Sequence, residues 1–431
     1  MVEHSPPLSF HVMNKPIGPS CNLACRYCFY LEKSALYQAP ESWRMPDEVL
    51  ERYIREYIAA QEVSDINFAW QGGEPTLLGL PFFARVVELQ ERYKPPGARI
   101  SNAFQTNGTL LDDDWGRFLA AHHFLVGLSI DGPQDLTDRH RVDGRGQGAF
   151  ARIMRGVDVL RRHRVEFNIL CCVNRDNARK PLKVYEFLKR LGTRFLQFIP
   201  IVERVGDADG PLDLALPPQA CQQPLPVTPW SVRPQDYGDF LIAIFDHWLR
   251  HDVGRVFVQM FDVQLGLRMG QPSALCVYAE RCGRGLAMEH NGDVYACDHY
   301  VYPGYRRGNI MTDSLRDMVC GPVQEDFGLA KGRDLPGQCR ACPYLRQCWG
   351  ECPKNRILTT ADGEPGLAYL CAGLQRFFAH ANPALDRMAA LLRAGQPAAR
   401  IMAELGGGGR PRPNDACPCG SGRKFKRCCG A

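Results

Sequence analysis

Strand-type and helix-type segments alternate along the first half of the chain, and this alternation restricts the fold more than any other feature. Runs of apolar and β-branched residues predict six strands, at residues 8–13, 66–71, 99–105, 124–130, 165–173 and 194–201. Segments with a helical period separate them, near 46–61, 81–94, 112–122, 148–163 and 181–191. Successive βα units imply a parallel sheet. Because a closed barrel needs eight units, we predict an α/β fold with a partial (β/α)6 TIM-like barrel that is open on one side.

The composition is that of an ordinary globular enzyme and does not indicate nucleic acid or a membrane as a partner. The 431 residues, 45% of them hydrophobic, can build a large core with smaller appendages. A formal charge of +5, with Lys and Arg spread along the chain, does not indicate nucleic acid. The first thirty residues lack a secretory pattern and no apolar run has the length of a bilayer span, so we expect a cytoplasmic protein without membrane contact. In that reducing compartment, 19 cysteines indicate metal ligation rather than disulfides.

Three cysteines follow the first predicted strand with C-x3-C-x2-C spacing: Cys21, Cys25 and Cys28. Three thiolates hold only three irons of a [4Fe-4S] cubane, which leaves one iron open to a ligand. A structural zinc site would need a fourth protein ligand. The spacing therefore favours a cluster that binds a substrate, with a zinc knuckle or a redox thiol cluster as the alternative.

Polar, glycine-containing turns follow the next three strands, at residues 71–75 (QGGEP), 105–108 (QTNG) and 129–132 (SIDG). The carboxyl ends of parallel strands meet at one face of a barrel, where active sites form. Two adjacent glycines in the first turn let the backbone approach a ligand without a Cβ in the way. Each turn alone is also an ordinary βα turn. Their joint occurrence after the cysteine loop favours a binding site.

Eight further cysteines are concentrated between residues 276 and 371: Cys276, Cys282, Cys297, Cys339, Cys342, Cys348, Cys352 and Cys371. Eight thiolates fill two four-coordinate sites, and the surrounding Gly, Pro and Arg residues predict loops that can wrap a metal centre. Structural zinc and iron-sulfur clusters use similar loops, so spacing alone leaves both open.

The chain ends with a helix-type stretch, a GGGGRPRP linker and a short cysteine-rich segment. Residues 414–431 contain two cysteine pairs on either side of a GSGRK turn, which comprise Cys417, Cys419, Cys428 and Cys429. Four thiolates close a tetrahedral zinc site, and a segment with almost no apolar core needs the metal to fold. We expect a Zn²⁺ there, and the alternative is a disordered tail.

The motifs resemble three known families. The string CNLACRYCFY and the GGEP turn resemble the radical S-adenosylmethionine (SAM) superfamily, in which the open iron binds SAM and an electron cleaves it to a 5′-deoxyadenosyl radical. The later cysteines, with GDVYACDHY among them, resemble the SPASM domain, which carries two fully ligated [4Fe-4S] clusters. The C-terminal segment resembles the SEC-C zinc motif.

These resemblances imply a domain plan and a set of ligands. The plan is a radical SAM core at 1–233, a SPASM domain at 234–382, a helix and linker at 383–413, and the SEC-C-like motif at 414–431. The SPASM resemblance implies one cluster on Cys276, Cys282, Cys297 and Cys352, and another on Cys339, Cys342, Cys348 and Cys371. Three [4Fe-4S] clusters are expected in all.

The combination of CNLACRYCFY, AWQGGEPTLLG, FQTNG, SIDGP, FIPIV and YACDHY resembles the anaerobic sulfatase-maturating enzymes over about residues 8–380. That family oxidises a cysteine or serine of a sulfatase to Cα-formylglycine. The resemblance implies a sulfatase polypeptide as partner and a reduced flavodoxin- or ferredoxin-type electron donor. Asp298, directly after Cys297, resembles the family's general base. The SAM contacts that the resemblance implies are Tyr27, Gly73, Ser129, Arg141 and Val202.

Two other functions remain open at this stage. One is a different SPASM enzyme that forms crosslinks in a ribosomal peptide, and the other is a non-enzymatic iron-sulfur or zinc adaptor. Taken alone, Asp298 could be a solvated loop residue and Arg141 a surface cation. Cys171 and Cys172 lie within a strand pattern, where free cysteines are usually small buried apolar residues. Residues 203–234 are expected to form a long connecting loop.

Overall fold

The computed structural model describes residues 7–37, 42–204, 226–406, 413–414 and 423–427. The four cysteines of the expected zinc motif lie outside these residues, as does most of the loop expected at 203–234. Among the helices in the described part, none combines the length and the apolar character needed to cross a bilayer.

A ten-stranded sheet forms the centre of the molecule, in the order β10-β9-β8-β1-β2-β3-β4-β5-β6-β7. Six parallel strands in chain order make up its main part: β1 (His11–Lys15), β2 (Asp65–Trp70), β3 (Arg99–Thr106), β4 (Leu125–Ser129), β5 (Phe167–Val173) and β6 (Phe195–Pro200). The short β7 (Phe257–Val258) adds to the edge of β6. The expected partial (β/α)6 barrel is confirmed, although the first strand begins at His11 rather than at residue 8.

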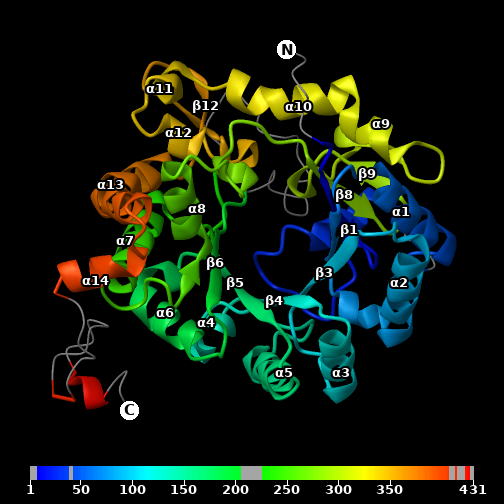
Figure 1. Cartoon of the computed structure of the whole chain (residues 1–431), viewed down its shortest axis with the longest axis horizontal. Helices are drawn as coiled ribbons and strands as arrows, with labels where there is room; N and C mark the ends of the chain where they lie inside the picture. Colours follow the sequence, from blue (N-terminus) through cyan, green and yellow to red (C-terminus); the bar gives the residue numbers. More distant parts are fainter. Residues whose placement is uncertain (1–6, 38–41, 205–225, 407–412, 415–422, 428–431) are drawn as a thin grey trace.

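Helices surround this sheet on its outer side (Figure 1). The helices of the barrel are α1 (Asp47–Ala60), α2 (Leu80–Tyr93), α3 (Asp113–Ala121), α4 (Gln134–Thr137), α5 (Phe150–Arg162) and α6 (Pro181–Lys189). Each longer helix buries one apolar face, as α1 does with Leu50, Tyr53 and Ile54. The start of α3 is fixed by Asp112, whose carboxylate accepts a hydrogen bond from the Trp115 amide.

Three strands from the second half of the chain extend the sheet beyond β1. They are β8 (Gly285–Glu289), β9 (Asp293–Tyr295) and β10 (Arg306–Asn309). β8 is parallel to β1, with His11 opposite Gly285 and Lys15 opposite Glu289. β9 is antiparallel to β8, and β10 is antiparallel to β9. Figure 1 shows β8 and β9 beside β1 and α1. Because Cys297 comes two residues after β9, the pairing brings it to the barrel.

The second half contains several helices besides the loops expected around its cysteines. Its helices are α7 (Pro234–His251), α8 (Gln259–Arg268), α9 (Leu315–Cys320), α10 (Pro322–Arg333), α11 (Gly337–Arg340), α12 (Leu345–Cys348), α13 (Cys371–Arg393) and α14 (Ile401–Glu404). α13 packs along α7, where a Cβ on Gly373 would lie 1.9 Å from the Pro234 carbonyl oxygen. The helix expected after residue 383 thus begins earlier, at Cys371, and contains Pro383.

Short elements complete the described chain. A two-stranded ribbon pairs β11 (Leu358–Thr359) with β12 (Pro365–Leu367). Short 3-10 helices include those at Leu31–Leu36, Pro75–Leu78, Asn177–Arg179, Cys276–Tyr278, Asp298–Tyr300, Pro303–Tyr305, Pro353–Asn355, Ala398–Arg400 and Phe425–Arg427. Cys276 begins one of these turns, and Cys297 and Cys352 directly precede two others, so the short elements position their sulfur atoms.

Candidate active site and cluster sites

The three-cysteine loop lies between the end of β1 and the first 3-10 turn. Burial raises the pKa of Cys21 and of Cys25 to about 12, and the neighbouring Cys28 adds to the rise of both pKa values. Two hydrogen bonds partly offset the rise for Cys21. The Leu23 amide donates to Cys21 Sγ at 3.3 Å and Asn107 Nδ2 donates to it at 3.8 Å, and both lower the pKa of this thiol. Thiols that ionise reluctantly when free become thiolates when they bind a metal. The three sulfur donors therefore fit an iron-sulfur cluster.

The turn after β2 packs directly on this loop. The Gly73 amide donates to the Gly18 carbonyl at 2.7 Å, and the Glu74 amide donates to the Ser20 carbonyl at 2.9 Å. A Cβ on Gly73 would lie 1.8 Å from the Ser20 carbonyl oxygen. Only glycine allows the two backbone segments to come this close.

The buried carboxylate of Glu74 joins two of the predicted turns. It accepts hydrogen bonds from the side chains of Thr76 and Thr106, at 2.6 and 2.7 Å, and from the Asn107 amide at 2.7 Å. Burial raises the pKa of Glu74, although these hydrogen bonds oppose the shift. The turns after β2 and β3 are thus held together at one rim of the barrel.

Asp131 connects two of the expected SAM contacts. Its buried carboxylate accepts hydrogen bonds from the Tyr27 hydroxyl, from Arg141 Nη2 at 3.0 Å and from the Cys172 amide at 3.0 Å. Arg141 Nε is buried and has no hydrogen-bond partner among the described residues. A guanidinium with an unused N–H group suits an incoming carboxylate, such as that of SAM. The sequence motif contained Asp131, but its connecting role was not expected.

Ser129 and Val202 lie at the same rim. Ser129 is the last residue of β4, and Val202 follows the end of β6. The Val202 carbonyl accepts a hydrogen bond from Lys354 Nζ at 2.7 Å, and Glu203 Oε1 accepts another at 2.7 Å. The chain around the later cysteines therefore contacts the barrel rim. The five expected SAM contacts come from five different segments, and their binding of SAM stays a prediction.

Cys171 and Cys172 differ in their surroundings. Cys171 is fully buried, as expected for a small apolar residue. Cys172 is only partly buried, and its sulfur lies 3.8 Å from Arg141 Nη2. The expectation that both are ordinary core residues is therefore wrong for Cys172, because alternate strand residues face opposite sides of the sheet.

Asp298, the first residue of the 3-10 turn after β9, lies beside the end of β1, where its carboxylate forms an ion pair with Lys15. Lys15 is 1% exposed and Asp298 is 18% exposed. Burial alone would raise the pKa of Asp298, but the charge of Lys15 holds it below its usual value. Lys15 Nζ also donates to Gln71 Oε1 at 3.1 Å and lies 4.2 Å from the centre of the Tyr30 ring. The carboxylate is therefore anionic and lies on the same rim as the cysteine loop.

Four later cysteines lie close together between the barrel and α10. They come from the 3-10 turn at 276–278, the loop before β8, the residue after Ala296, and the residue before Pro353: Cys276, Cys282, Cys297 and Cys352. Burial raises the pKa of Cys297, and the nearby Cys352 and Cys276 raise it further. A group of four thiols that hinder one another's ionisation fits a metal centre.

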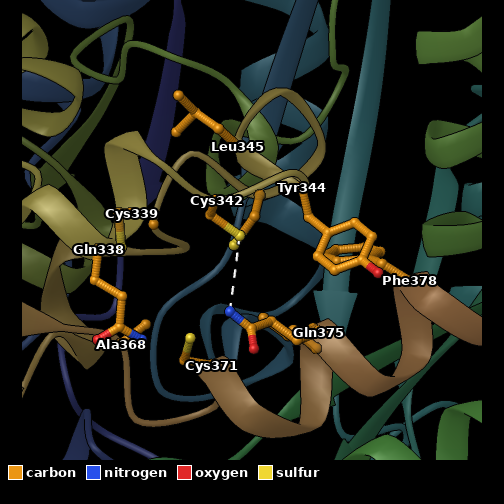
Figure 2. Close-up of a pocket in the computed structure, with 12 residues that line it drawn as sticks. Gln338, Cys339, Cys342, Tyr344, Leu345, Ala368, Cys371, Gln375 and Phe378 are labelled. Atoms are coloured by element: carbon orange, nitrogen blue, oxygen red, sulfur yellow. Dashed lines mark hydrogen bonds between the residues drawn. The ribbon is translucent and has the colours of Figure 1, made fainter. Parts of the chain in front are cut away.

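The remaining four cysteines line one cavity (Figure 2). Its volume is about 420 Å³ with the open mouth included, and its cysteines are Cys339, Cys342, Cys348 and Cys371. Tyr344, Leu345 and Phe378 make much of the wall apolar. Gln375, on the first turn of α13, donates an N–H group to Cys342 Sγ at 3.7 Å. Four sulfur donors around an apolar cavity fit a fully ligated cluster.

The sequence matches three family models. They are the radical SAM superfamily over residues 16–188, the SPASM iron-sulfur cluster-binding domain over 276–343, and the SEC-C motif over 414–431. These matches confirm the three resemblances. The SEC-C match covers residues that are mostly outside the described structure.

Curated relatives match most of the chain. A serine-type anaerobic sulfatase-maturating enzyme of Bacteroides thetaiotaomicron is 44% identical over 92% of this chain and 95% of its own length. The serine-type enzyme of Klebsiella aerogenes is 39% identical over 86% of this chain and 85% of its own. A cysteine-type enzyme of Clostridium perfringens is 34% identical over 89% of this chain and 99% of its own.

Solved structures agree with the sequence relatives. A structure described as native anSMEcpe with bound AdoMet and Cp18Cys peptide is 33% identical, covers 89% of this chain and 99% of its own, and has a TM-score of 0.76. Streptococcus suis SuiB bound to its precursor peptide SuiA, at 15% identity, 84% and 76% coverage, and a TM-score of 0.57, shares the fold alone. On the identity and coverage of its curated relatives, the chain belongs to the anaerobic sulfatase-maturating enzymes of the radical SAM superfamily.

Proposed function

We propose that this chain oxidises a cysteine or serine residue of a sulfatase polypeptide to Cα-formylglycine. The observation that carries the proposal is the position of an anionic carboxylate, Asp298, at the rim that holds the cysteine loop. The relatives, named as serine-type and cysteine-type sulfatase-maturating enzymes, support the reaction. The serine-type relatives have the higher identities, and this supports serine as the first substrate to test.

The cofactors in this proposal are SAM and three [4Fe-4S] clusters, held by Cys21, Cys25 and Cys28 and by the two groups of four cysteines. When bound, SAM and the first cluster supply the 5′-deoxyadenosyl radical. Arg141, oriented by Asp131, holds the SAM carboxylate with its unused Nε. Tyr27, Gly73, Ser129 and Val202 form the rest of the pocket.

Asp298 accepts the proton of the substrate hydroxyl or thiol at its carboxylate. Lys15 keeps the carboxylate ionised, so that the acceptor is available at neutral pH. Oxidation to the aldehyde level removes two electrons. One leaves with the abstracted hydrogen atom, and the two four-cysteine sites are where this chain would hold acceptors for the other.

The proposal extends to partners and compartment. A reduced flavodoxin- or ferredoxin-type protein is the proposed electron donor, and the chain is proposed to act in the cytoplasm without nucleic acid or membrane. The SEC-C match supports a Zn²⁺ on Cys417, Cys419, Cys428 and Cys429. That segment is proposed to dock the sulfatase polypeptide.

The test uses the reconstituted enzyme, SAM, an anaerobic reductant and two sulfatase-motif peptides that differ only in Ser or Cys. Mass spectrometry should show the loss of two hydrogens from the serine peptide. In the cysteine peptide the same loss gives a thioaldehyde, which water hydrolyses to the aldehyde with release of hydrogen sulfide. Asp298→Asn should lower oxidation by about 10²-fold or more while SAM cleavage and iron content persist. Asp317→Asn, an exposed carboxylate on α9, is the matched control.

Different outcomes separate the alternatives. SAM cleavage without aldehyde, together with a crosslinked product, would favour a peptide crosslinking enzyme. Absence of SAM cleavage by the fully loaded protein would favour an adaptor. Wild-type oxidation by Asp298→Asn would remove the carboxylate from the reaction, whereas loss of iron in that variant would give it a structural role.

A further inference from the structure

A buried lysine on α10 lies beside the first group of four cysteines. Lys331 is 1% exposed, and its ammonium donates to three backbone carbonyl oxygens. These belong to Cys276, at 2.5 Å, to Val277, at 3.0 Å, and to Ala279. All three N–H groups of the ammonium are therefore used on one turn of the chain, the turn that carries the cluster ligand Cys276.

The same face of α10 holds the other end of this loop. The Cys282 amide donates to the Gly328 carbonyl at 3.2 Å, and a Cβ on Gly328 would lie 2.4 Å from the Cys282 carbonyl oxygen. A Cβ on Gly332 would lie 3.1 Å from the Glu280 carbonyl oxygen. Gly328, Lys331 and Gly332 have the spacing of one helical face. Gly328 and Gly332 thus let the ligand loop lie against α10, and the hydrogen bonds of Lys331 hold the loop in this position.

The charge of Lys331 is not balanced by a close carboxylate. In the part of the chain that the structure describes, the hydrogen bonds of its nitrogen go to these backbone carbonyls, and no Asp or Glu oxygen lies within 4.0 Å of it. The ionisable groups that interact with it are the thiols of Cys276, Cys282 and Cys352, the cation Arg356, and the buried carboxyl group of Glu351. A buried ammonium is unfavourable unless it has compensating partners. Three of the four thiols expected to ligate one cluster face this cation.

We propose that Lys331 is a positioning residue for the auxiliary cluster on Cys276, Cys282, Cys297 and Cys352. Its three hydrogen bonds hold the ligand loop in place, and its charge raises the reduction potential of that cluster. A cluster held by four thiolates is anionic, and its potential depends on nearby charge and hydrogen bonding. A higher potential makes the cluster a better acceptor for the electron that substrate oxidation releases. The inference rests on the ligand set in the proposed function.

The test compares three variants of the full-length, reconstituted enzyme. Lys331→Met removes the charge and the hydrogen bonds, Lys331→Gln removes the charge but keeps hydrogen-bond donors, and Lys331→Arg keeps the charge. Arg333→Met, an exposed residue of the same helix that pairs with Asp326 and Asp334, is the control. Iron content and potentials from an EPR-monitored redox titration are measured for each.

We expect one of the three cluster potentials to become more negative in the Gln variant, with a smaller shift in the Arg variant and none in the control. The Met variant should show the same shift or lose the iron of one cluster, about four atoms. Aldehyde formed per SAM cleaved should fall in both neutral variants. Unchanged iron and potentials in the Met variant would overturn the proposal. If the Lys331→Met variant fails to fold, unchanged cluster potentials in the Lys331→Gln variant would overturn the role of the Lys331 charge.

These readouts do not depend on the peptide reaction. If the wild-type enzyme forms no formylglycine but Lys331→Gln shifts one potential, the proposed function fails and the role of Lys331 stands. If formylglycine forms and no potential moves in any variant, the role of Lys331 fails alone.

Discussion

Replacing Gly73 by Ala should push the turn after β2, where we propose that SAM binds, away from the cysteine loop. The added Cβ would lie 1.8 Å from the Ser20 carbonyl oxygen, 1.6 Å short of the 3.4 Å at which ordinary contact begins. The Ser20 carbonyl carbon at 2.4 Å and the Pro19 carbonyl carbon at 2.8 Å block the same space. All three atoms belong to the backbone, so no side chain can rotate out of the way. The two segments must move apart.

The magnitude follows from that displacement. Two backbone hydrogen bonds join the segments, Gly73 to Gly18 and Glu74 to Ser20. Each contributes about 0.5–1.5 kcal/mol, so their loss costs roughly 1–3 kcal/mol. Ser20 precedes Cys21, a proposed cluster ligand, and a misplacement of about 1 Å at a reacting centre can lower a rate by about 10²-fold. We therefore expect SAM cleavage to fall by about 10²-fold or more, while the fold is retained.

The assay measures 5′-deoxyadenosine by chromatography under anaerobic reducing conditions, with iron content and circular dichroism in parallel. Gly144→Ala is the matched control, because nothing lies within 4 Å of the added Cβ and no left-handed backbone is required. The control should cleave SAM like the wild type. Wild-type cleavage by Gly73→Ala would refute the close packing of the two segments or its importance for SAM.

Three further predictions test separate parts of the chain. Replacing Cys21, Cys25 and Cys28 by Ala should remove about four irons and all SAM cleavage, and a full iron complement would contradict the open-cluster assignment. Truncation before Gly406 should remove about one zinc by metal analysis and leave SAM cleavage intact, whereas a loss of iron would refute the domain boundary. Burial raises the pKa of Asp262 from 3.8 to about 7, so its ionisation destabilises the fold increasingly as pH rises between these values. Asp262→Asn should therefore increase the free energy of unfolding by roughly 2 kcal/mol more at about pH 8 than at about pH 5.5, and the melting temperature should rise accordingly. An equal rise at both pH values would contradict the raised pKa of Asp262.

The barrel was predictable because its elements are encoded locally. Each predicted strand and helix of the barrel has its own periodic pattern, and the structure places them within a few residues of the predicted bounds, as for α6 at Pro181–Lys189. Gly192 lies shortly after the end of α6 with a φ of 97°, in the left-handed region where glycine commonly ends a helix. These signals need no knowledge of distant contacts.

The contacts that organise the site are long-range, so the sequence did not reveal them. Lys15 pairs with Asp298, and Tyr27 and Arg141 meet on Asp131. Nothing in a one-dimensional pattern shows which buried charge compensates which other. A lysine that ends an apolar strand was a usable signal, since a buried ammonium requires a partner. α13 was missed at its start because Pro383 lies within it and proline usually ends a helix.

The pairing of β8 with β1 bears on how this enzyme could be recombined with its relatives. A chimera joined near residue 233 would place β1 of one parent beside β8 of the other, although five residue pairs from His11 to Lys15 must match across that seam. One of those pairs joins Lys15 to Glu289, next to the site of Asp298. The exchangeable unit is therefore discontinuous in sequence. A graft of the auxiliary-cluster region should take its own first strand along with it.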